Sequence, residues 1–182
     1  MLKLSDEARR ELSQAVAEAA GRTEIRAAVE SLYARLQVEI DERKPKCDAS
    51  GRCCRFEEYG HRLFVTTIEL ATFADCLQEA EAPARPSSVG SGKRLGGGLA
   101  LPIATVGCQY QVDGLCSVHP IRPFGCRIFF CDPTAQAWQN ERYETFHAEL
   151  RRLHETLGIP YFYVEWREAL RALGLGGKAM LS

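Results

Sequence analysis

The chain has 182 residues, of which 46% are hydrophobic and 26% charged, a composition typical of a soluble globular domain that is long enough to bury a core. Its 23 basic and 24 acidic residues give a net charge of -1, so the sequence carries no electrostatic footprint for nucleic acid. No apolar run approaches the ~18–20 residues of a membrane span, and residues 1–10 are charged, unlike a secretory signal. We therefore expect a cytoplasmic protein without a membrane or nucleic-acid partner.

Two helices are predicted at the N-terminus. Apolar residues recur at three- and four-residue spacing over residues 6–20, with Ser5 as the expected N-cap and Gly21 as the expected stop. A second amphipathic helix is predicted to follow, capped by Thr23. Neither helix offers chemistry, so residues 1–44 are interpreted as an N-terminal helical pair that serves as a scaffold or as a dimerisation hairpin.

Residues 45–182 are predicted to form a cysteine-cluster metal-binding domain with C-terminal helices, packed with the N-terminal pair as one compact unit. A short strand is expected over 61–65. Thr66 and Glu69 then have the spacing of a capping box, which opens a helix. The Pro-, Gly- and Ser-rich residues 81–98 are interpreted as a plain loop.

The C-terminal part is predicted to be helical. Asp132 and Pro133 are a good N-cap and first helical residue for a long helix that ends at Gly158. Residues 161–164 favour neither helix nor strand, and a last short helix is predicted over 165–173.

Seven of the eight cysteines fall in two clusters. Thiols in the cytosol are kept reduced, so clustered cysteines there more often ligate a metal than form disulfides; a disulfide-stabilised exported protein is the alternative. Cys76 lies on an apolar helical face and is interpreted as a small buried hydrophobe. The predicted metal ligands are Cys47, Cys53, Cys54, Cys108, Cys116, Cys126 and Cys131.

The downstream cluster contains a hairpin signal, Asp113-Gly114, between two short apolar runs. A two-residue turn there pairs Val112 with Leu115, whereas a three-residue turn brings Cys108 onto the face of Cys116. Either register gathers polar ligands at one end of a rigid element.

The number of thiols leaves the number of centres open. Neighbouring side chains of a loop or extended segment point to opposite sides. We therefore expect either that Cys53 and Cys54 bind two different metal centres, or that one of them binds a metal and the other packs against neighbouring side chains. One four-ligand centre leaves three of the seven cysteines idle, and two such centres need an eighth ligand. His119, His61, Ser50 or water could supply it.

The spacing of the cysteines bears on the metal. Zinc sites favour paired Cys-x2-4-Cys knuckles, and in the downstream cluster only Cys126 and Cys131 come close to that spacing. Iron–sulfur clusters tolerate more varied spacing. Arginines beside the cysteines could offset the negative charge of a thiolate-bound centre or simply face solvent. They are Arg52, Arg55, Arg122 and Arg127.

The cysteine pattern resembles that of a bacterial cysteine-cluster family of zinc- or iron-chelating proteins, often called Fe–S oxidoreductase-like. The family motif Cys-x2-Cys-x2-Cys-Cys is matched by Cys47, Cys53 and Cys54, with Ser50 in place of the second cysteine. The downstream matches are Cys108, Gly114-Leu-Cys-Ser-Val-His119, Arg122-Pro-Phe-Gly-Cys-Arg-Ile-Phe129 and Cys131. The resemblance covers roughly residues 45–132 and implies a metal-binding function.

We therefore expect a single domain, mainly α, with a small β-hairpin and an irregular cysteine-rich metal-binding centre. The preferred cofactor is an iron–sulfur cluster in a redox or group-transfer protein. The alternative is a zinc-binding structural or interaction module without catalysis.

Overall fold

The computed structural model describes residues 4–81 and 107–175, which are mostly helical and form one compact domain. The predicted loop at 81–98 lies outside the described residues, except for Glu81, which ends a helix. The α-helices are α1 (Asp6–Ala19), α2 (Thr23–Arg43), α3 (Phe56–Tyr59), α4 (Thr67–Glu81), α5 (Phe124–Ile128), α6 (Gln136–Leu157) and α7 (Trp166–Ala172). Three 3-10 helices are η1 (Arg52–Cys54), η2 (His119–Ile121) and η3 (Pro133–Ala135).

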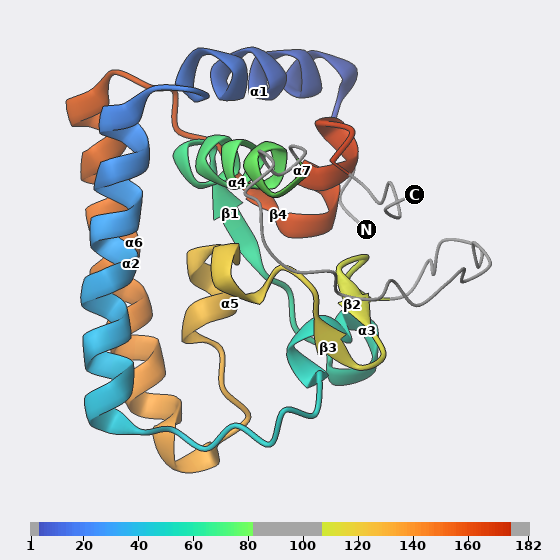
Figure 1. Cartoon of the computed structure of the whole chain (residues 1–182), viewed down its shortest axis with the longest axis vertical. Helices are drawn as coiled ribbons and strands as arrows, with labels where there is room; N and C mark the ends of the chain where they lie inside the picture. The colour runs from blue at the N-terminus through green and yellow to red at the C-terminus, as the bar shows by residue number, and fades with distance from the viewer. Residues whose placement is uncertain (1–3, 82–106, 176–182) are drawn as a thin grey trace, which may run out of the picture.

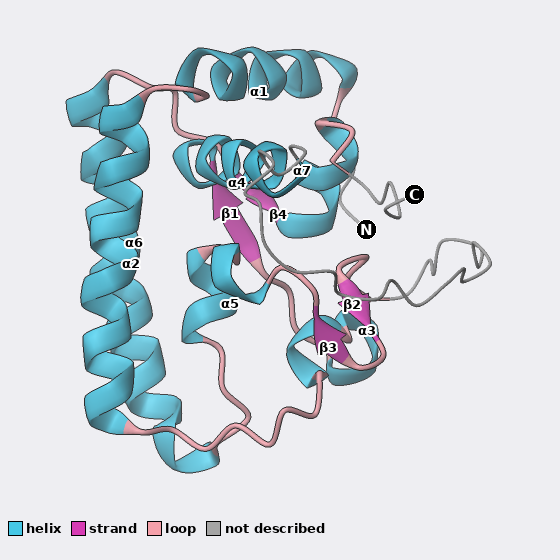
Figure 2. Ribbon diagram, in the orientation of Figure 1, coloured by secondary structure: helices cyan, strands magenta, loops and turns pink. Residues whose placement is uncertain are grey.

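Two long helices and a group of shorter elements make up the architecture. Helices α2 and α6 run along one side of the molecule, and α1 and α7 lie with α4 at one end (Figure 1). Four short strands form two antiparallel two-stranded sheets (Figure 2). The strands are β1 (Phe64–Thr66), β2 (Gln111–Val112), β3 (Leu115–Cys116) and β4 (Tyr163–Glu165).

The N-terminal helices are integrated with the rest of the chain. Ser5 caps α1 as predicted, because its hydroxyl accepts the N–H of Ala8 at 3.1 Å. Thr23 is not a cap: it is the first residue of α2, whose N-cap is Arg22 without a side-chain hydrogen bond. The apolar faces of both helices join the same hydrophobic core as the later elements. Packing against α4, rather than a hairpin between the two, therefore holds the pair.

Strands β1 and β4 join distant parts of the chain. Val65 pairs with Val164, and both side chains are buried. Strand β1 begins three residues later than the sequence predicts. The residues 161–164, which favour neither helix nor strand in the sequence, overlap the partner strand β4. The N–H of Trp166 donates to the carbonyl of Leu63 at 2.9 Å, so the ladder also fixes the start of α7.

The hairpin has the register of a two-residue turn. Val112 pairs with Leu115 and Gln111 with Cys116, so the three-residue alternative is wrong. Asp113 and Gly114 have φ of 50° and 80°, which is the pair of positive φ values that a type I′ turn requires.

The C-terminal helices follow the predicted plan with shifted starts. The Asp132 side chain accepts the N–H of Thr134 at 2.9 Å, but it caps η3, and α6 begins only after that turn. Gly158 ends α6 with a φ of 68°. None of the described helices is both long and apolar enough to cross a membrane.

Candidate metal centre

Five of the seven clustered cysteines line one cavity of about 40 Å³. They come from three parts of the chain, namely η1, the hairpin with the loop before it, and α5. Apolar side chains, including Phe56, Leu63 and Trp166, form much of the remaining wall. The five cysteines are Cys53, Cys54, Cys108, Cys116 and Cys126. The upstream and downstream clusters therefore meet in space.

The adjacent cysteines Cys53 and Cys54 face the same cavity. Their sulfur atoms are 4.0 Å apart. The expectation that they point to opposite sides is wrong, because they lie on a 3-10 helix. Successive side chains of such a helix differ in direction by about 120°, compared with 180° in an extended strand.

Backbone hydrogen bonds attach the hairpin to the upstream loop. The N–H of Cys108 donates to the carbonyl of Cys54 at 2.7 Å. The Gln111 side-chain amide donates to the carbonyl of Gly51 at 2.9 Å. Gly51 has a φ of +67°, and a Cβ atom there would lie 2.2 Å from the carbonyl oxygen of Gly114. A side chain at this position would therefore separate the two cysteine-bearing segments.

A buried carboxylate positions the fifth cysteine. Glu69 is 2% exposed, and its carboxylate accepts the N–H of Phe124, the first residue of α5, at 2.8 Å. The same carboxylate accepts hydrogen bonds from the Tyr33 hydroxyl and from the N–H and hydroxyl of Thr66, each at 2.9 Å. The carboxylate thus joins α2, β1 and α5 through four hydrogen bonds and fixes the position of α5, which carries Cys126.

The thiols perturb one another's pKa values. The Cys54 thiol faces the sulfurs of Cys108, Cys116 and Cys53, and these contacts raise its pKa. The hydrogen bond with Cys54 is in turn the main cause that lowers the pKa of Cys53 to about 6 and that of Cys116 to about 7. It also lowers the pKa of Cys108, with a further contribution from the Trp166 side chain. The contact among the four thiols therefore makes the thiolate form of Cys53, Cys108 and Cys116 more favourable and that of Cys54 less favourable.

Cys126 differs from the other four. Burial raises its pKa well above the ordinary value, and the nearby thiols Cys108, Cys116 and Cys53 raise it further. It is therefore a neutral thiol in the absence of a cation.

Of the four arginines beside the cysteines, Arg122 is the one that lines the cavity. Its charge helps to lower the pKa values of Cys53 and Cys116. Its Nε atom is buried and has no hydrogen-bond partner among the described residues. A buried unpaired donor is costly, so this N–H is available to an acceptor that a bound group would bring.

The other three arginines contact different groups. Arg127 donates to the carbonyls of Arg122 and Pro120 and lies 4.3 Å from the centre of the Tyr33 ring. Arg52 and Arg55 both lie over the ring of Tyr59. Burial raises the pKa of Cys131, and the charge of Arg52 partly offsets that increase.

Comparison of the chain with models of known protein families, with curated proteins and with solved structures finds no match. The family resemblance of the cysteine motif therefore stays a prediction. Among the described residues, no group of three or more His, Cys, Asp or Glu side chains is arranged so that it could hold a metal ion. The five thiols share a cavity but do not form a ready-made coordination polyhedron.

Cys47 and Cys131 are exposed and do not line the cavity. Their backbones lie close together, because the N–H of Lys46 donates to the Asp132 carboxylate at 3.0 Å. Ser50 is also nearby, and a hydrogen bond from its side chain opposes the burial that raises the pKa of Cys131. The structure thus places two of the predicted ligands outside the cavity but close to one of its thiols, because Cys53 also raises the pKa of Cys131.

The two histidines left open as ligands occupy different places. His119 lines the cavity, and burial lowers its pKa, with a further contribution from Arg122 and Arg127, so its ring is neutral at pH 7. His61 lies outside: its Nε2 atom donates to the carbonyl of Cys53 at 3.2 Å. His61 therefore supports the backbone of a cavity cysteine.

Sequence reasoning missed two kinds of residue in this site. Glu69 was recognised as part of a capping box, but nothing in its spacing shows that it also reaches α5. Phe56, Leu63 and Trp166 are ordinary apolar residues in the sequence, and only the fold makes them a wall. Cys76 lies on α4 and does not line the cavity, but it is half-buried and not the fully buried residue that the sequence predicts.

Proposed function

We propose that the protein binds a metal centre in the five-cysteine cavity, with an iron–sulfur cluster as the preferred occupant. The observation that carries the proposal is the convergence of thiols from both cysteine clusters on one cavity. A closed zinc site and an iron–sulfur cluster each need four thiolates, so the five cavity thiols are enough for either. The preference for iron–sulfur rests on the spacing of the cysteines, because iron–sulfur clusters tolerate more varied spacing than zinc knuckles. The resemblance to the zinc- or iron-chelating family supports the same function.

The donor set is suited to a cationic centre. A metal ligand must be a thiolate, and the pKa values of Cys53, Cys108 and Cys116 are already lowered. Arg122 contributes positive charge and an unpaired N–H. Hydrogen bonds to the sulfurs of a cluster are among the factors that set its reduction potential.

The chain then has a simple redox role. When bound, an iron–sulfur cluster supplies one-electron transfer. Phe56, Leu63 and Trp166 limit the access of water to the cavity, and Arg122 stabilises the negative charge of its thiolates. The neutral ring of His119 can accept a proton when charge in the cavity changes. We place this activity in the cytoplasm, where the eight free cysteines stay reduced.

A zinc-binding structural module is the second candidate, and one distance is compatible with it. Two thiolates on a tetrahedral zinc ion with Zn–S bonds of about 2.3 Å lie ~3.8 Å apart, close to the 4.0 Å between the sulfurs of Cys53 and Cys54. In that case the metal would hold the irregular cysteine segments between the helices without catalysis.

Anaerobic purification followed by metal and acid-labile sulfide analysis separates the two candidates. We expect a coloured protein with iron and sulfide. A colourless protein with stoichiometric zinc and no sulfide would replace the iron–sulfur proposal by the zinc proposal. Protein that takes up neither metal after anaerobic reconstitution would contradict both.

Chelation then tests the role of the metal. A folded apo-protein with a redox-active holo form supports the redox role. Loss of helical circular dichroism on metal removal, together with a redox-silent holo form, supports the structural role.

A further inference from the structure

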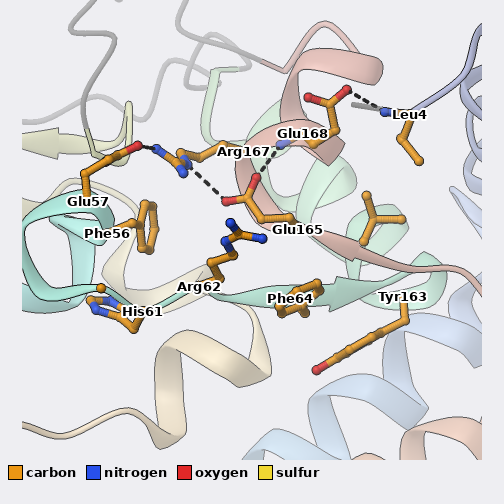
Figure 3. A pocket seen from close by; sticks show the side chains of 12 residues that line it. Leu4, Phe56, Glu57, His61, Arg62, Phe64, Tyr163, Glu165, Arg167 and Glu168 are labelled. Atoms are coloured by element: carbon orange, nitrogen blue, oxygen red, sulfur yellow. Dashed lines mark hydrogen bonds and ion pairs between the residues drawn. The ribbon is translucent and has the colours of Figure 1, made fainter. Parts of the chain in front are cut away.

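A larger pocket of about 520 Å³ lies next to the cysteine cavity, between α3, β1, β4 and the start of α7 (Figure 3). Its volume is within the range of small-molecule sites. Phe56 lines both the pocket and the cysteine cavity. His61, which also lines the pocket, donates to the carbonyl of Cys53. A molecule in the pocket would therefore lie against the wall of the cysteine site.

The carboxylates of the pocket already have partners. Glu57 and Glu165 both pair with Arg167, which lies between them (Figure 3). Glu168 pairs with Arg9 at 3.2 Å. These groups form a closed network, so they offer little attraction to a cationic ligand.

Arg62 is different from Arg167. No described residue forms a hydrogen bond or ion pair with its guanidinium, which reaches into the pocket (Figure 3). A guanidinium presents a planar fork of N–H donors that matches a carboxylate or phosphate group. Arg62 is thus the free cationic group with which an anion in this pocket would pair.

The wall beside Arg62 is flat and apolar. Phe64 and Tyr163 stack with ring centres 4.8 Å apart and an angle of 16° between the rings. Phe56 closes the other side, with Arg167 4.8 Å from its ring centre. These rings stack on each other, and the aromatic surface that they and Phe56 leave toward the pocket favours a ligand with a flat apolar body.

We propose that this pocket binds a small organic anion with a flat apolar body, whose acidic group pairs with Arg62. This proposal does not depend on the identity of the metal. The bound anion would lie against the wall of the cysteine cavity, because Phe56 lines both.

Two fluorescent probes with the same aromatic framework test the proposal. One is 8-anilinonaphthalene-1-sulfonate, an anion with a flat naphthalene body, and the other is N-phenyl-1-naphthylamine, which lacks the sulfonate. We expect saturable binding of the anion at one site. Arg62→Gln should weaken that binding about tenfold, the size of a charge-assisted hydrogen bond, and leave the neutral probe unaffected.

Arg152→Gln is the matched control, because Arg152 is an exposed arginine on α6 that does not line the pocket. Arg62→Lys should recover part of the affinity, since it keeps the charge but loses the fork. Equal thermal unfolding midpoints establish that the variants are folded. An equal loss for both probes, an unchanged affinity of the anion in Arg62→Gln, or an equal loss in Arg152→Gln would overturn the proposal.

Displacement of the probe separates the sources of the acidic group. Benzoate and phenyl phosphate share the flat body and differ in the acid. Displacement by either supports the proposal and identifies the preferred acid, and displacement by neither overturns it. Metal content measured on the same samples is an independent result. Anion binding without metal would support the pocket proposal and contradict the metal proposal, and metal without anion binding would do the opposite.

Discussion

The Glu69 carboxylate accepts the backbone N–H of Phe124 at 2.8 Å, across 55 residues of the chain. This hydrogen bond joins the start of α4 to the start of α5. Since Cys126 follows Phe124 by two residues, a change at Glu69 acts on the cysteine cavity without touching a thiol.

Glu69→Gln tests this anchor in metal-free protein. The glutamine keeps the shape but turns one acceptor into a donor that faces existing donors, which should cost about 1–3 kcal/mol. Burial raises the pKa of Glu69 above its unfolded value of about 4.3. The stability that this raised pKa provides is complete below the unfolded pKa and is lost as pH rises through the folded pKa.

The stability gap between wild type and Glu69→Gln should therefore be widest near pH 4 and narrow as the pH increases. Urea unfolding from pH 4 to pH 8 measures it. Glu11→Gln, at an exposed position on α1, should follow the wild-type curve. A gap that widens with pH would contradict the burial argument.

Serine substitutions test which cysteines hold the metal. A four-ligand centre uses four of the five cavity cysteines, so serine substitution at four of these positions should reduce the metal content of anaerobically purified protein to less than half. Cys47→Ser and Cys131→Ser should retain most of it, because these thiols lie outside the cavity, and Cys76→Ser is the control. Unchanged metal content in Cys53→Ser and Cys54→Ser would mean that the downstream cluster works alone.

The pKa of Cys53 is testable in metal-free protein. Its pKa is lowered to about 6, mainly by the hydrogen bond with Cys54 and to a smaller extent by Arg122. Alkylation of Cys53 by iodoacetamide, followed by peptide mass spectrometry, should reach half its maximum rate near pH 6.

Removal of either neighbour makes the Cys53 thiolate less favourable and moves that midpoint upward. Cys54→Ala should have a larger effect than Arg122→Gln. Cys76 provides an internal reference, because burial raises its pKa and its alkylation should follow at higher pH. A wild-type midpoint for Cys53 above pH 8 would contradict the contact between the two thiols.

Gly51→Ala should weaken the attachment of the hairpin. Gly51 and Gly60 have nearly the same positive φ, but a Cβ at Gly60 meets nothing within 4 Å, whereas one at Gly51 lies 2.2 Å from a backbone oxygen. Both substitutions cost about 1–2 kcal/mol for the left-handed backbone. The steric clash adds to this only in Gly51→Ala.

The difference between the two variants in urea unfolding therefore isolates the contact between the cysteine segments. Gly51→Ala should also bind less metal, while Gly60→Ala should bind the wild-type amount. Equal behaviour of the two would show that the upstream loop and the hairpin are not coupled.

Local signals in the sequence predict local structure well. The Ser5 cap, the Thr66–Glu69 capping box and the turn at Asp113-Gly114 depend on residues within a few positions of one another. Their chemistry is therefore visible in the sequence itself. The mainly helical fold with a small hairpin follows from the same patterns and is confirmed.

Long-range pairing limits what can be predicted. The partner of β1 lies about a hundred residues away, and nothing in residues 61–66 identifies it. The division of the cysteines into five inside the cavity and two outside is also a result of tertiary packing. Spacing alone treats Cys47 and Cys53 alike, although one is exposed and the other lines the cavity.

The late position of Trp166 in the chain affects how long the cavity cysteines remain uncovered during synthesis. All five cavity cysteines have left the ribosome once residue 126 emerges, but Trp166, which closes the wall behind Cys108, is synthesised 40 residues later. At about 5–20 residues per second, that interval lasts roughly 2–8 s. During it the nascent chain carries five cavity thiols that Trp166 does not yet cover, so for these seconds the fold itself gives them incomplete protection from oxidation.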